Sequence, residues 1–143
     1  MQDFFGRAQA APERVVVFMA DQGRSYTAGA LAQMAQQMAQ WLAAQGLQTG
    51  ERFAVLLENR VEILALVLAA RQAGLYAAVL STHLTADEVA YIVGDSGARL
   101  VVASDKTLSQ LQGIGLPCWT VDEARPQAPS LDAALAALQG PPV

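Results

Sequence analysis

Reactive and metal-ligating side chains are scarce in this sequence of 143 residues. It contains one cysteine, Cys118, and one histidine, His83. A single cysteine cannot form a disulfide within the chain, and a single histidine cannot supply the histidine cluster of a typical metal site. These scarcities exclude a disulfide-stapled scaffold and predict no metal centre. They are typical of the reducing cytoplasm, so we expect a cytoplasmic protein.

Basic residues and long hydrophobic runs are also few. Lysine and arginine number 9 against 13 acidic residues, and the only lysine is Lys106. Nucleic-acid binding needs a basic stripe, and no Lys/Arg cluster occurs, so we exclude that class of partner. The longest uninterrupted apolar run, 63–70, is far shorter than the roughly 20 residues that span a bilayer, so we expect no transmembrane segment. Segment 1–10 also lacks the apolar core of a signal peptide.

Apolar side chains, in contrast, are abundant. Hydrophobic residues make up 53% of the sequence and charged residues only 15%, which excludes disorder. The chain is also long enough to bury a core. Such a composition indicates a sheet covered on both faces, or a surface that packs against something else. We therefore expect exposed apolar surface and a tendency to form homo-oligomers.

The N-terminal part predicts a β-hairpin followed by an amphipathic helix. Residues 14–19 are apolar and β-branched, 20–23 have turn character, and 24–26 can return as a second strand. Thr27 is a suitable N-cap, and Gly46 is expected to end the helix. Apolar residues recur at helical spacing between them, at Leu31, Met34, Met38, Trp41 and Leu42. This spacing predicts one buried stripe.

Predicted strands and helices then alternate. Strands are expected at 52–57, 75–80, 99–103 and 117–121. Helices are expected at 60–73, from a cap at Thr85 to Val93, and from a cap at Ser104 to about Leu111. Glycines expected to end helices are Gly46, Gly74, Gly94 and Gly113. The alternation predicts a doubly wound, mainly parallel α/β sheet with helices on both faces.

Structural roles account for most conspicuous polar residues. Asn59 with Glu62 has the spacing of a capping-box variant, and Thr85 with Glu88 forms a full Thr-x-x-Glu capping box. Cys118 lies in a predicted strand without a base or cation beside it in sequence. We interpret it as a small buried hydrophobe.

The composition of the sequence changes after the last predicted strand. We divide the chain into an N-terminal α/β subdomain at 1–121, a proline-containing linker at 122–130, and a short helix with the start of the next connection at 131–143. Ser130 is expected to cap that helix. Pro141 and Pro142 are typical of the beginning of another connection, so we expect the sequence to be an incomplete piece of a longer protein.

Ligands of doubly wound sheets bind at the carboxyl ends of the strands, near a topological switch point. The residues that follow the first three predicted strands of the sheet are Glu58-Asn59-Arg60, Ser81-Thr82-His83 and Ser104-Asp105. None is a glycine-rich phosphate loop, and the sequence has no G-x-G-x-x-G, Walker or G-x-S-x-G motif. We therefore predict no complete catalytic site. His83 lies where a ligand contact is available, although an ordinary loop histidine is the simpler interpretation.

Four stretches in order resemble the opening of AMP-forming acyl-CoA synthetases, which belong to the adenylate-forming superfamily. They are RSYT at 24–27, GERFAVLLEN at 50–59, ARQAGLY at 70–76 and THLTADEVAYIVGDSGAR at 82–99. The last stretch is most similar to bacterial long-chain fatty-acyl-CoA ligases. The resemblance covers about 14–104, well over half of the chain.

This resemblance implies the N-terminal fragment of an ATP-dependent ligase. In that family a carboxylate, here expected to be a fatty acid, attacks the α-phosphate of Mg-ATP, and CoA then displaces AMP from the acyl-adenylate. The parent enzyme would use ATP, Mg and CoA, with none bound by the fragment. The family's Ser/Thr/Gly-rich phosphate loop with its lysine is missing, so the fragment is expected to be inactive, with no catalytic residue and no metal site. A basic residue often occupies the position of His83, and in some relatives it lies near the phosphates of CoA, which makes His83 a candidate CoA contact.

Two other interpretations stay open. The chain could be a stand-alone α/β binding or interaction module. It could also open a different adenylating enzyme, such as an aryl-acid ligase or a peptide-synthetase adenylation domain. Under the ligase interpretation, the main partner is the remainder of the parent enzyme.

Overall fold

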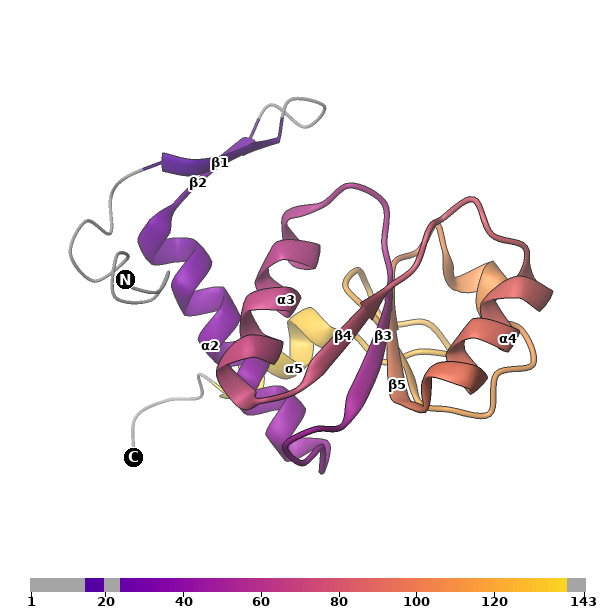
Figure 1. Cartoon of the computed structure of the whole chain (residues 1–143). Helices are drawn as coiled ribbons and strands as arrows, with labels where there is room; N and C mark the ends of the chain where they lie inside the picture. Colours follow the sequence, from indigo (N-terminus) through magenta and orange to yellow (C-terminus); the bar gives the residue numbers. More distant parts are fainter. Residues whose placement is uncertain (1–14, 20–23, 139–143) are drawn as a thin grey trace.

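The computed structural model describes residues 15–19 and 24–138 (Figure 1). Strands β1 (Val15–Met19) and β2 (Arg24–Thr27) pair antiparallel, which confirms the predicted hairpin. The turn predicted at 20–23 lies outside the described residues. This small sheet is separate from the main sheet of the fold.

The main sheet has four strands in the order β4-β3-β5-β6. They are β3 (Arg52–Leu56), β4 (Tyr76–Val79), β5 (Ala98–Ala103) and β6 (Cys118–Thr120). All neighbouring pairs are parallel. The predicted doubly wound α/β fold is therefore confirmed, since each strand is joined to the next by a crossover.

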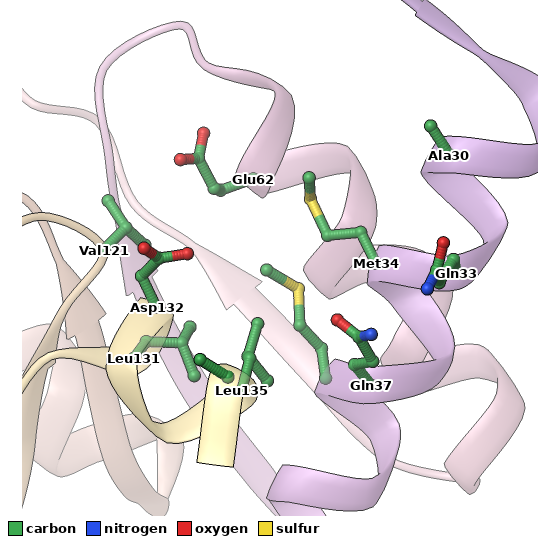
Figure 2. A pocket seen from close by; sticks show the side chains of 11 residues that line it. Ala30, Gln33, Met34, Gln37, Glu62, Val121, Leu131, Asp132 and Leu135 are labelled. Carbon is green, nitrogen blue, oxygen red and sulfur yellow. The ribbon is translucent and has the colours of Figure 1, made fainter. Parts of the chain in front are cut away.

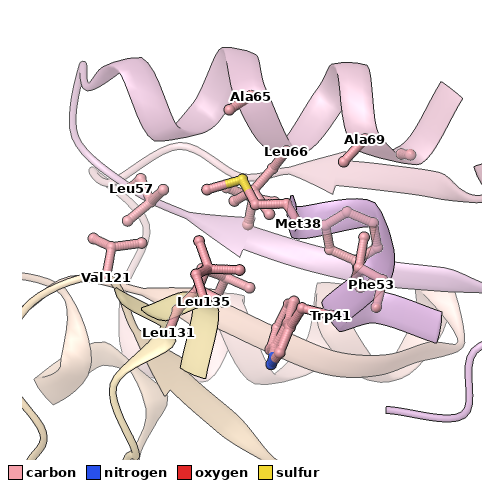
Figure 3. Close-up of a cluster of buried hydrophobic side chains, with 14 of the residues drawn as sticks. Met38, Trp41, Phe53, Leu57, Ala65, Leu66, Ala69, Val121, Leu131 and Leu135 are labelled. Carbon is pink, nitrogen blue, oxygen red and sulfur yellow. The ribbon is translucent and has the colours of Figure 1, made fainter. Parts of the chain in front are cut away.

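Helices cover both faces of this sheet (Figure 1). On one face lie α2 (Ala28–Ala44), α3 (Val61–Ala73) and α5 (Leu131–Leu138). On the other lie α4 (Ala86–Ser96) and the 3-10 helix η1 (Leu108–Leu111). Strand β3 is buried on both faces because its side chains alternate. Phe53 and Val55 join the core under α2, α3 and α5, where Figure 3 shows Phe53, and Leu56 joins the core under α4.

Helix α2 follows the local sequence closely. Thr27 Oγ1 accepts a hydrogen bond from Ala30 N at 3.1 Å, and Gly46 follows the helix with a φ of +87°, as predicted. Trp41, in the C-terminal part of the stripe, is buried. Its ring meets Trp119 of β6 edge-on, with the ring centroids 5.1 Å apart. This aromatic contact holds α2 against β6, the strand at the opposite edge of the main sheet from β4.

The start of α3 differs from the prediction. Arg60, not Asn59, occupies the N-cap position, and among the described residues it makes no side-chain capping bond. Glu62 binds the Arg60 guanidinium instead, at 2.9 Å. The Glu62 carboxylate makes a bidentate, charge-assisted contact with the guanidinium, and such a contact is stronger than a capping bond to a neutral backbone N–H. Gly74 ends the helix as predicted, with a φ of +74°.

Helix α4 begins as predicted and ends later. Thr85 Oγ1 accepts from Glu88 N at 3.2 Å, and Glu88 Oε1 accepts from Thr85 N at 2.9 Å, which confirms the capping box. Gly94 was expected to end the helix, and that prediction is wrong. The helix runs on to Ser96, and Gly97 adopts the left-handed conformation that allows β5 to begin at the next residue.

The residues after β5 also depart from the prediction. Ser104 is not a helix cap, because its hydroxyl donates to Glu58 Oε2 at 2.6 Å and it is fully buried. Thr107 precedes the short 3-10 helix η1 instead. A buried hydroxyl at a strand end binds the acceptor that tertiary packing brings to it, whatever its local sequence favours.

The segment after β6 folds back on the sheet. Thr120 N donates to Pro129 O at 3.0 Å, and Ala128 is buried. Ser130 Oγ accepts from Ala133 N at 3.2 Å, which confirms the predicted cap of α5. The division of the chain into 1–121, 122–130 and 131–143 stays a prediction.

Strand β4 lies at the edge of the sheet and is not covered as expected. Its side chains Tyr76 and Val79 are 62% and 49% exposed. The apolar composition of this strand therefore reflects surface as well as core. Across the residues that the structure describes, no helix has the length and hydropathy needed to cross a membrane.

Candidate functional site

The topological switch point of the sheet lies between β3 and β5. From β3 the chain crosses through α3 to β4 on one side, and through α4 on the opposite face it returns to β5 on the other side. Ligand crevices of doubly wound sheets form at this position, outside the carboxyl ends of the strands. Glu58, Ser104 and Asp122 lie within two residues of the carboxyl ends of β3, β5 and β6. Their side chains are joined in one network.

Arg60 is the centre of this strand-end network. Its Nη1 lies 2.9 Å and 3.0 Å from the two carboxylate oxygens of Asp122, and 3.3 Å from Glu58 Oε1. Its Nη2 donates to Glu62 Oε2 at 2.9 Å, and Nε donates to the other oxygen of Glu62 at 3.3 Å. One half-buried cation therefore holds three carboxylates from the ends of β3 and β6 and the start of α3.

Buried hydroxyls extend the network to β5. Ser104 Oγ donates to Glu58 Oε2, and Ser104 N donates to Thr107 Oγ1 at 2.9 Å. Thr107 Oγ1 donates in turn to the carbonyl of Leu56, the last residue of β3, at 2.7 Å. These bonds fix the carboxyl ends of β3 and β5 against each other.

A second, more exposed ion pair lies beside the network. Asp105 N donates to Asp122 Oδ2 at 2.9 Å, and the Asp105 carboxylate accepts from Arg125 Nε and Nη2 at 3.1 Å and 2.8 Å. The hydrogen bond from Arg125 lowers the pKa of Asp105. Asp122 thus links the buried and exposed parts of the site.

The contacts of Glu58 and Arg60 set their charge states. Burial acts to raise the pKa of Glu58, but the Ser104 hydroxyl, the backbone and Arg60 together outweigh it, so the pKa is lowered. Burial acts to lower the pKa of Arg60, and the bonds to Asp122 and Glu62 outweigh it, so the pKa is raised. Both groups therefore stay charged at neutral pH, and their attraction is retained.

This arrangement is suited to holding the strand ends rather than to catalysis. Both arginines are already bound to carboxylates, so neither offers an unused charge to a phosphate. Carboxylates outnumber arginines here, which disfavours the phosphates of ATP. In the part of the chain that the structure describes, no group of three or more His, Cys, Asp or Glu side chains could hold a metal ion.

The two residues singled out by their scarcity lie apart from this network. His83 is exposed in the loop after β4, and that loop is held by Gln110 Nε2, which donates to Thr82 O and Leu84 O at 3.0 Å and 2.7 Å. Cys118 is half-buried, its Sγ donates to Leu116 O, and burial raises the pKa of its thiol. It is therefore no activated nucleophile, in accord with its interpretation as a packing residue.

A cavity of about 330 Å³ lies between α2 and α5, beside the start of α3 (Figure 2). Its apolar side is formed by Met34, Met38 and Leu135. Glu62 and Asp132 supply carboxylates at its polar side. Glu62 lines the cavity and also binds Arg60, so the cavity adjoins the strand-end network.

Sequence reasoning located these strand ends but missed the network. Glu58, Arg60 and Ser104 stand directly after predicted strands, which was the available signal. Asp122 was assigned to a linker, and Glu62 to a cap. Only the pairing of three distant strands brings these groups within hydrogen-bonding distance.

Comparison with known proteins identifies the family. The family model described as AMP-binding enzyme matches residues 4–139. The chain belongs to this family. It is 33% identical over 109 residues to a 2-succinylbenzoate–CoA ligase of Geobacillus kaustophilus, which is 76% of this chain and 22% of that protein. It is 38% identical over 69 residues to a long-chain-fatty-acid–CoA ligase of Mycobacterium tuberculosis, which is 48% of this chain and 14% of that protein.

Solved structures show the same fold. The O-succinylbenzoate coenzyme A synthetase of Bacillus subtilis in complex with AMP superposes with a TM-score of 0.74 at 28% identity, over 86% of this chain and 32% of that one. A long-chain-fatty-acid CoA ligase structure from Rhodopseudomonas palustris gives a TM-score of 0.83 at 24% identity, over 92% of this chain and 35% of that one. The matched part of the chain therefore covers between 14% and 35% of these proteins.

Proposed function

We propose that this chain is the N-terminal part of an AMP-forming acid–CoA ligase that activates a fatty acid. The observation that carries the proposal is the family match over 4–139, combined with a 2-succinylbenzoate–CoA ligase relative of which the chain covers only 22%. In the complete enzyme the carboxylate would attack the α-phosphate of ATP, release pyrophosphate and form an acyl-adenylate, which the thiol of CoA would convert to the thioester. ATP, Mg and CoA would be bound by that complete enzyme.

In this proposal the chain is a wall of the large domain and not its catalytic centre. The Arg60 network lies at the strand ends of its switch point, and the carboxylates of the network repel phosphate. The donors that neutralise ATP during transfer would come from other parts of the enzyme. The chain alone would accordingly be inactive.

The gene sequence tests the proposal directly. We expect the reading frame after Val143 to encode a Ser/Thr/Gly-rich loop with a lysine. The complete protein should release pyrophosphate from ATP and Mg when a fatty acid is present, and it should form acyl-CoA when CoA is added. The purified 143-residue chain should release none under the same conditions. A stop codon directly after Val143, or turnover by the chain alone, would contradict this assignment.

A panel of acids separates the fatty-acid proposal from its rivals. The 38% identity to a long-chain-fatty-acid–CoA ligase supports a fatty acid, whereas the longer match to a 2-succinylbenzoate–CoA ligase favours an aromatic acid. Pyrophosphate release should be highest with fatty acids and lower with benzoate, succinylbenzoate or amino acids. Preference for an aromatic acid would refute the fatty-acid substrate and leave the ligase chemistry intact.

His83 is proposed to contact CoA in the complete enzyme. Its side chain is exposed in the loop after β4, where it can reach a ligand. His83→Ala should raise the KM for CoA about fivefold, the equivalent of a hydrogen bond worth ~1 kcal/mol, and leave the KM for ATP unchanged. His83→Arg should restore the KM. An unchanged KM for CoA in His83→Ala would remove His83 from the site.

A further inference from the structure

The cavity between α2 and α5 has no role in the ligase chemistry proposed above (Figure 2). Its floor is buried, since Met38 and Leu135 are only 1% and 7% exposed, and its rim is open, because Gln33 and Asp132 are exposed. Its volume of about 330 Å³ lies within the range of roughly 300–1,000 Å³ that small-molecule sites occupy. The cavity can therefore admit a small molecule from solvent.

The two charged side chains that line the cavity are both acidic. They are Glu62, in the first turn of α3, and Asp132, in the first turn of α5. In the described part of the chain, no ion pair involves Asp132. The Arg60 cation beside Glu62 is shared among three carboxylates, so it does not reverse the sign of the local field. This side of the cavity therefore favours a cation and disfavours an anion.

Two methionines determine which kind of apolar group fits the cavity. Met34 and Met38 are one turn apart on α2, and both line the wall. Methionine side chains adapt to the shape of a ligand, and their sulfur atoms make favourable contacts with aromatic rings. Figure 2 shows the Asp132 carboxylate and the Gln37 amide on opposite sides of Met34. An aromatic group against the methionines would thus lie next to the acidic side of the cavity.

We propose that this cavity binds a small aromatic amine in its protonated form. The ammonium group would donate hydrogen bonds to Asp132 and Glu62. Arg60 already donates to both oxygens of Glu62, but a carboxylate has about four acceptor sites, so Glu62 can accept a further bond. The aromatic ring would pack against the thioethers of Met34 and Met38. The proposal rests on the cavity alone and not on ligase activity.

Methyl NMR of the 143-residue chain, labelled at methionine, tests where the amine binds. The probe is 2-phenylethylamine. The methyl signals of Met34 and Met38, identified with Met34→Leu and Met38→Leu, should shift and saturate with a Kd below about 10 mM. Two molecules of similar size and shape are controls for charge. The neutral 2-phenylethanol should bind about tenfold more weakly, and the anionic 3-phenylpropionate should cause no saturable shift.

A matched pair of variants tests the role of the Asp132 carboxylate. Asp132→Asn should weaken the binding of 2-phenylethylamine about fivefold, because it removes a charged acceptor. Asp87→Asn is the control and should leave binding unchanged. Both aspartates are exposed and stand second in their helices, but Asp87 lies on α4, on the other face of the sheet. Circular dichroism would confirm that both variants fold.

Three results would overturn the proposal. The first is the absence of a saturable shift at Met34 and Met38 with 2-phenylethylamine. The second is binding of either control molecule as tightly as the amine. The third is equal weakening by Asp132→Asn and Asp87→Asn, since a general loss of negative charge would then explain the effect.

Discussion

Replacing Arg60 with alanine tests whether the strand-end network stabilises the fold. Arg60 binds Glu58, Glu62 and Asp122 at 2.9–3.3 Å, and its side chain is 19% exposed. The substitution leaves three neighbouring carboxylates without their shared cation. Removing one partner of a fully buried ion pair costs about 3–5 kcal/mol, and an exposed pair contributes about 0–1 kcal/mol. The intermediate burial of Arg60 therefore predicts a loss of about 2–3 kcal/mol.

Urea and thermal unfolding, followed by circular dichroism, measure this loss. A decrease of about 2–3 kcal/mol corresponds to a Tm lowered by about 6–12 °C in a chain of this size. Arg99→Ala is the matched control, because it breaks one 2.7 Å pair with Glu51 whose arginine is 61% exposed. It should cost less than about 0.5 kcal/mol. If Arg60→Ala is as stable as Arg99→Ala, the network does not stabilise the fold and our reasoning is refuted.

Four further substitutions test single contacts or backbone positions. The lowered pKa of Glu58 contributes stability that is fully present above the unfolded-state pKa of about 4.3 and is lost as pH falls through the folded pKa. Ser104→Ala removes the hydroxyl that donates to Glu58 Oε2 and so reduces this contribution. The midpoint of acid unfolding, followed by circular dichroism, should therefore move to higher pH. Gly74→Ala should lower the unfolding free energy by about 2 kcal/mol and Gly97→Ala by about 1 kcal/mol, because both have a left-handed φ but only at Gly74 would a Cβ meet Thr49 Cγ2, at 3.0 Å. Thr85→Ala should cost about 1 kcal/mol in urea unfolding through loss of the capping box, and an unchanged midpoint would contradict that role.

In the candidate site, local sequence predicted the positions of the residues but not their hydrogen-bonding partners. The positions of Glu58, Arg60 and Ser104 after strands follow from the apolar runs before them, and these positions were predicted. Their partners were not, because a hydrogen bond between Ser104 and Glu58 spans 46 residues and depends on β3 lying beside β5. Glu62 could satisfy either a backbone N–H or a guanidinium, and only the folded chain shows that Arg60 is the nearer and stronger partner.

Strand β4 and helix α4 show the same division. The local spacing of residues was enough to predict the alternation of strands and helices, the parallel fold, and the caps at Thr27 and Thr85. These features depend on backbone preferences and hydrophobic periodicity within a few residues of the chain. The sequence could not decide that β4 lies at the edge, because a strand of the same composition fits the centre or the rim. It could not decide between Gly94 and Gly97 as the end of α4, since either accepts a left-handed φ. Tertiary packing decided both, because strand order and the point where β5 begins depend on contacts between segments far apart in the chain.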